Sequence, residues 1–75
     1  MKIEEFIENF AGEFDETPAE KFVPTTEFKS LEDWNSLTAL SIISMIDDQY
    51  DKTITGADLR NSKTIEDLFN IVVSK

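Results

Sequence analysis

The sequence contains no cysteine and no histidine. Without cysteine the chain forms neither a disulfide nor a thiolate metal site, and without histidine it lacks the commonest general base and the commonest metal ligand. Its 75 residues also make a core too small to hold a deep catalytic cleft. We therefore expect a single domain over residues 1–75 that is not an enzyme and has no metal site.

Basic residues are scarce as well. The chain has 7 Lys and Arg against 16 Asp and Glu, which gives a formal net charge of −9. Such a surface repels nucleic acid and anionic lipid and attracts partners with basic patches. Long apolar runs are missing, including the apolar stretch of an N-terminal signal peptide. The composition thus predicts an acidic, cytoplasmic, monomeric protein that binds neither nucleic acid nor membranes.

Four segments have the sequence pattern of a helix. The first spans residues 3–14, and the longest begins at Ser36 and continues to Tyr50. Thr55 is expected to cap a short third helix, and Thr64 to cap the last one in a capping box with Asp67. The predicted buried positions are Ile3, Phe6, Ile7, Phe10, Ala11, Phe14, Ala39, Ile42, Ile43, Ile46, Tyr50, Ile65, Leu68, Phe69, Val72 and Val73. The fold class is therefore all-α: a small four-helix bundle of three principal helices and one short helix.

A long connection separates the first two helices. From Asp15 to Asn35 the helical periodicity fails, and Pro18 and Pro24 interrupt the chain. Thr17 is expected to cap a short helix that has Pro18 at its first position. The apolar residues of this connection are Phe22, Val23, Phe28 and Leu31. A loop with so many apolar groups is expected to pack over the core.

The most informative stretch lies where this connection ends. Asn35 closes the loop, Ser36 begins the longest helix, and Leu37 follows it. This stretch resembles the phosphopantetheine-attachment region of the acyl carrier protein family, whose usual core is Asp-Ser-Leu at the start of the second helix. The likeness covers nearly the whole chain, from the phenylalanine-rich first helix to the Thr64-Ile65 start of the last. It implies a stand-alone acyl carrier with 4′-phosphopantetheine, derived from coenzyme A, attached to Ser36.

The physical setting of Ser36 suits such an attachment. A helix N-terminus offers free backbone N–H groups and a partial positive charge, both of which favour a phosphate. The arm brings its own thiol, so the lack of cysteine is no obstacle. The alternative is that Ser36 is a plain N-cap, since serine is favoured there, and that the chain is an unmodified interaction module.

One residue departs from the family pattern. Asn35 stands where the family usually has aspartate, so it keeps the capping ability but loses the charge. The resemblance suggests that this carboxylate helps a transferase hold its metal ion, so loading of Ser36 is expected to be slower. Glu32 and Asp33 are candidates to replace the missing carboxylate.

The resemblance also implies partners: a phosphopantetheinyl transferase, and acyl-loading and acyl-transfer enzymes with basic and apolar docking patches. The expected partner-binding residues are Asn35, Leu37, Leu40, Asp47, Asp48 and Ile54. Carriers of fatty-acid synthesis generally show more acids on this helix, where the chain has Thr38, Ser41 and Ser44. This favours a specialised fatty-acid or polyketide-type pathway.

Two further alternatives remain. An aminoacyl or peptidyl carrier, loaded by an adenylating enzyme, would use the same arm on Ser36. Residues 47–58 also place side-chain oxygens at loop positions 1, 3, 5 and 12 of a calcium-binding EF-hand, but Lys52 occupies the position that requires glycine.

Overall fold

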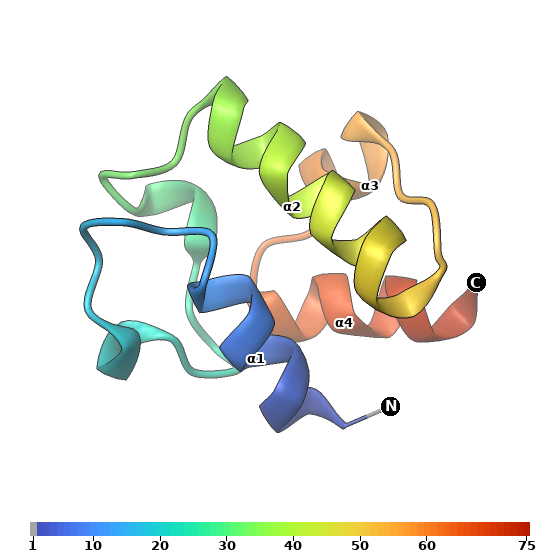
Figure 1. Cartoon of the computed structure of the whole chain (residues 1–75), viewed down its shortest axis with the longest axis horizontal. Coiled ribbons are helices and arrows are strands. Elements are labelled where there is room, and N and C mark those ends of the chain that lie inside the picture. The colour runs from blue at the N-terminus through green and yellow to red at the C-terminus, as the bar shows by residue number, and fades with distance from the viewer. Residues whose placement is uncertain (1) are drawn as a thin grey trace.

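Four α-helices and two single turns of 3-10 helix form the regular structure of the computed structural model, which describes residues 2–75 (Figure 1). The α-helices are α1 (Ile3–Ala11), α2 (Ser36–Tyr50), α3 (Gly56–Arg60) and α4 (Ile65–Ser74), and the 3-10 turns are η1 (Ala19–Lys21) and η2 (Phe28–Ser30). α1 packs against α2 and α4, and α3 packs against α4. The predicted all-α fold, with a long loop between its first two helices, is confirmed.

α1 is shorter than its apolar stripe suggests. The helix ends at Ala11, and Phe14, predicted to lie on it, follows a tight turn in which the Phe14 N–H donates to Ala11 O at 3.0 Å. This turn directs the Phe14 ring back into the core, where it is buried. The periodicity therefore identified a core residue correctly but placed it on the wrong element.

α2 buries a slightly different stripe from the one predicted. Ile42 and Ile46 are fully buried, and Met45, which was not predicted, is buried with them. Ala39, Ile43 and Tyr50 are half-buried against the same core. The Tyr50 hydroxyl accepts a hydrogen bond from Asn9 Nδ2 at 2.8 Å, which ties the last turn of α2 to α1.

Both predicted threonine caps are present. The Thr64 hydroxyl accepts from the Asp67 N–H at 3.1 Å, and the Asp67 carboxylate accepts from the Thr64 N–H at 3.0 Å. Thr55 and Asp58 form a second capping box at the start of α3. Backbone hydrogen bonds from Thr64 and Lys63 hold the pKa of Asp67 below its usual value of 3.8, because they stabilise the charged carboxylate.

The long connection is bonded to the start of α4. The N–H groups of Ile65 and Glu66 donate to Thr26 O at 3.1 Å and to Pro24 O at 3.0 Å. A helix start leaves such donors without intrahelical acceptors, so the loop carbonyls complete the cap of α4. The expected Thr17 cap is wrong: Pro18 holds the N-cap position of η1 without a side-chain bond.

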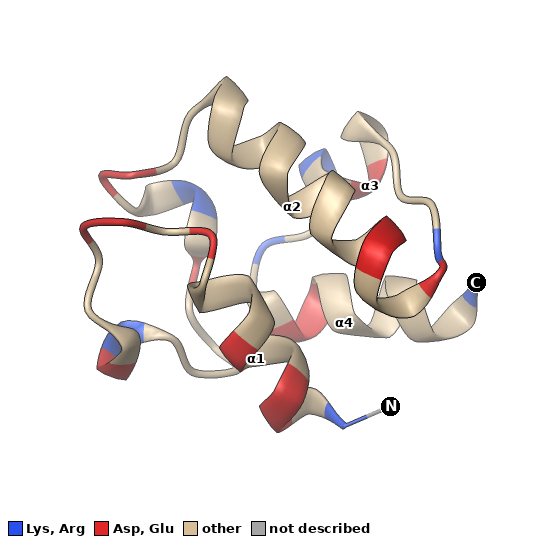
Figure 2. Cartoon of the chain, viewed as in Figure 1, with Lys and Arg blue, Asp and Glu red and all other residues tan. Residues whose placement is uncertain are grey.

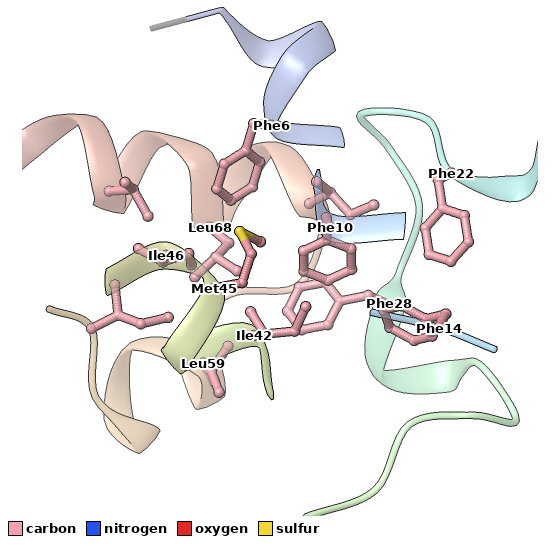
Figure 3. Close-up of a cluster of buried hydrophobic side chains, with 13 residues drawn as sticks. Phe6, Phe10, Phe14, Phe22, Phe28, Ile42, Met45, Ile46, Leu59 and Leu68 are labelled. Atoms are coloured by element: carbon pink, nitrogen blue, oxygen red, sulfur yellow. The ribbon is translucent and has the colours of Figure 1, made fainter. Parts of the chain in front are cut away.

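The core is built around phenylalanine (Figure 3). Phe10 of α1 lies 5.4 Å from Phe14 and 5.3 Å from Phe28, measured between ring centroids, and 6.2 Å from Phe22. Trp34, at the end of the connection, packs edge-on against Phe28 at 5.0 Å. The expectation that the connection packs over the core is confirmed, since Phe22 and Phe28 are buried.

Three apolar residues lie elsewhere than expected, and one of them is Val23 of the connection, which is 47% exposed. Val73, predicted to be buried on the last helix, is 51% exposed. Ile54, expected to contact partners, is 2% exposed and belongs to the core. Across residues 2–75, no helix combines the length and apolar character that crossing a bilayer would require.

The Asp67 capping box makes a pH-dependent contribution to stability. Because the pKa of Asp67 is lower in the folded protein, its contribution is present above the usual value of 3.8 and disappears as the pH falls through the folded value. Asp67→Asn keeps the shape but does not titrate. We expect the unfolding free-energy difference between wild type and Asp67→Asn, measured in urea by circular dichroism, to be constant above about pH 5 and to shrink below it. A difference that does not change with pH would contradict this role.

Candidate functional site

Ser36 is the first residue of α2, and its side chain is exposed. The N-cap is Asn35, whose Oδ1 accepts a hydrogen bond from the Thr38 N–H at 3.0 Å. The interpretation of Ser36 as an N-cap is therefore wrong. Within residues 2–75, the Ser36 hydroxyl and the N–H groups of Ser36 and Leu37 have no hydrogen-bond partner.

The start of α2 differs from the other helix starts in charge. The first turn of α2 contains no acidic residue, whereas those of α1, α3 and α4 each contain at least one. Figure 2 shows the N-terminal part of α2 free of charged residues, with the acids of this helix near its C-terminal end. In a chain of net charge −9, Ser36 thus lies at a helix terminus whose partial positive charge no first-turn carboxylate offsets.

The side chain of Asp33 is hydrogen-bonded to the α1–α2 connection. Its Oδ2 accepts hydrogen bonds from the N–H groups of Glu16 at 2.9 Å and Thr17 at 2.8 Å, and from the Thr17 hydroxyl at 2.9 Å. Burial raises the pKa of Asp33, but the bonds from Thr17 and Glu16 outweigh it and lower this pKa below 3.8. Asp33 is therefore poorly placed to replace the carboxylate missing at Asn35, and Glu32 is the exposed candidate.

Beyond Ser36, α2 presents two exposed leucines. Leu37 is 76% exposed and Leu40 is 62% exposed, so two large apolar side chains lie one helical turn apart on the outside of α2. Asp47 and Asp48 are exposed further along the helix. The structure brings these four residues to the outside of one helix but places Ile54 in the core.

The EF-hand alternative does not agree with the structure. Residues 47–50 form the last turn of α2 instead of a loop, and the Asp58 carboxylate is used by the α3 capping box and by Lys75 Nζ at 3.2 Å. The described part of the chain holds no group of three or more Asp and Glu residues arranged to bind a metal ion.

Comparison with known proteins shows to which protein family the chain belongs. A family model described as phosphopantetheine attachment site matches residues 5–72. The chain belongs to this family. No curated protein and no solved structure is significantly similar to it. As a family member the chain is a carrier of covalently attached 4′-phosphopantetheine, without catalytic activity of its own, and its partners are a phosphopantetheinyl transferase and acyl-handling enzymes.

The link from Asp33 to Glu16 and Thr17 was not predicted from the sequence of this carrier. The bonded residues are 16 and 17 positions apart, and the intervening connection has no periodicity that relates them. The one local signal was Thr17 itself, a residue that favours hydrogen bonds to nearby backbone. It was assigned to a helix cap instead.

The assignment of Asn35 as the cap can be tested by stability. Asn35→Ala removes the acceptor for the Thr38 N–H and is expected to lower the unfolding free energy by about 1 kcal/mol. Ser36→Ala removes no hydrogen bond seen in the structure and is expected to change it by less than about 0.5 kcal/mol. Urea unfolding followed by Trp34 fluorescence measures both. An equal loss in the two variants would show that Ser36 contributes to the cap.

Proposed function

We propose that Ser36 is the residue to which the phosphopantetheine arm of this carrier is attached. The supporting observation is its position: an exposed hydroxyl without a partner in residues 2–75, at the first position of a helix that has no acid in its first turn. The neighbouring Ser36 and Leu37 N–H groups suit a phosphodiester, since they are free donors at a helix N-terminus. When attached, the arm supplies a terminal thiol that holds acyl groups as thioesters.

The attachment reaction requires of the carrier only a reachable hydroxyl. Ser36 Oγ forms a bond to the phosphorus next to pantetheine, and the pyrophosphate bond of coenzyme A breaks. Adenosine 3′,5′-bisphosphate leaves, and the hydroxyl proton passes to a base of the transferase or to solvent. The carrier therefore needs no catalytic residue, which agrees with its lack of histidine and cysteine.

We further propose that α2 is the docking surface. Leu37 and Leu40 would anchor partners with apolar patches, and Asp47 and Asp48 would attract their basic residues. Asn35 lies beside Ser36 and joins this surface, while the buried Ile54 does not. The uncharged Thr38 lies between the two leucines, and the uncharged Ser41 and Ser44 lie between the leucines and the acids. This composition favours a carrier for a specialised fatty-acid or polyketide-type pathway.

Attachment to Ser36 can be tested by intact mass. Incubation with coenzyme A and a phosphopantetheinyl transferase of broad specificity is expected to add one phosphopantetheine group to wild type and none to Ser36→Ala. Ser44→Ala, which removes another exposed serine of α2, is the matched control and should be loaded like wild type. Loading of Ser36→Ala, or no loading of wild type beside a control carrier that is loaded, would contradict the proposal.

The departure at Asn35 leads to a second prediction. If a carboxylate at this position helps the transferase hold its metal ion, Asn35→Asp should speed the loading of Ser36. Asn70→Asp, on the exposed surface of α4, adds the same charge far along the chain and should leave the rate unchanged. The initial rate of phosphopantetheine loading, measured at a limiting concentration of transferase, tests this expectation. An equal or lower rate for Asn35→Asp would disprove the expectation.

A further inference from the structure

Asp33 connects the start of α2 to a distant part of the connection. Its side chain accepts the three hydrogen bonds from Glu16 and Thr17 described above. Its main-chain carbonyl accepts from the Thr38 hydroxyl at 2.6 Å and from Asn35 Nδ2 at 3.3 Å. The side chain of one residue thus holds the segment before η1, and its main chain holds the first turn of the helix that bears Ser36.

Electrostatic repulsion opposes this arrangement. Five acidic residues line one hollow together with Asn35 and Thr38, and these acids are Glu13, Asp15, Glu16, Glu32 and Asp33. Lys21 lines an adjoining hollow that shares Glu16, Glu32 and Asp33 with the first one. The segment from 13 to 18 contains no regular secondary structure, so fixing it costs conformational entropy. Hydrogen bonds to an ionised acceptor are the stronger kind, and these three hold the acidic segment against both costs.

We propose that Asp33 is a positioning residue for the modification of Ser36. It docks the Glu16–Thr17 segment against the first turn of α2 and holds Asn35 and Ser36 in the arrangement that the transferase binds. This inference rests on the proposed role of Ser36. Three hydrogen bonds of typical net strength shift the equilibrium between docked and undocked segment by on the order of a hundredfold. A transferase that binds the docked form then shows a higher KM for a carrier that is mostly undocked, with kcat unchanged.

Transferase kinetics on full-length variants test this directly. Asp33→Ala removes all three side-chain bonds and is expected to raise the KM for the carrier about tenfold without changing kcat. Asp33→Asn, which keeps an acceptor oxygen, should recover most of the loss. Thr17→Val removes one bond and should raise KM by less than about twofold in wild type, and not further in Asp33→Ala. The matched control Asp15→Ala removes a carboxylate from the same hollow without removing a hydrogen bond, so its KM should equal that of wild type.

Amide hydrogen exchange separates positioning from general destabilisation. In Asp33→Ala, exchange should be faster at Glu16 and Thr17 and also at Thr38 and Ala39, whose N–H groups bond to Asn35. Exchange in the core of α4, for example at Leu68, should be unchanged. The measurement does not depend on loading, and it also shows that the variant is folded.

These experiments distinguish a failure of the proposed function of Ser36 from a failure of the positioning role of Asp33. If wild type is not loaded, or Ser36→Ala is, the proposed function fails and this inference fails with it. If wild type is loaded at Ser36 but Asp33→Ala has the wild-type KM, only the positioning role is overturned. It is also overturned if Asp15→Ala raises KM as much as Asp33→Ala does, because the effect would then be one of charge, or if exchange at Thr38 is unchanged.

Discussion

The contact between Phe10 and the aromatic residues of the α1–α2 connection is the interaction on which the rest of the structure depends. α1 has nine residues, too few to be stable as an isolated helix in water. Phe22 and Phe28 come from a segment whose 3-10 turns have no side-chain caps. Neither part holds itself in place, but their rings bury one another in a common core. The connection is therefore part of the core, and it leads directly into the residue proposed to bear the arm.

The parts of the fold that the sequence predicted are those with local causes. Thr55 and Thr64 cap helices because the bonds they make close within three residues. The start of α2 was predicted correctly, yet Asn35 and not Ser36 is the cap, because two adjacent residues with similar capping preference are not separated by pattern alone. Ile54 was misassigned for a related reason: an apolar residue in a short extended link has no periodicity that reports whether it is buried.

The residues of the candidate site on α2 were predicted from the sequence, but the hydrogen bonds that surround the start of this helix were not. The serine, the two leucines and the acids of α2 follow one another along a helix, so their exposure follows from spacing. Asp33 was noted only as an available carboxylate, whereas the structure shows it engaged with Glu16 and Thr17. That bond pattern depends on how an irregular segment folds back, and no rule of spacing relates its members.

The carbonyls of Pro24 and Thr26 that complete the cap of α4 have a consequence for the order in which the chain becomes native. Their partners, Glu66 and Ile65, lie about forty residues further along the sequence. During synthesis these carbonyls have only water to bond until the last helix has emerged. Because the same connection runs on to Ser36, the segment that leads to this serine is completely bonded only when the start of α4 has left the ribosome. The connection is therefore held in its native place only after α4 has been synthesised.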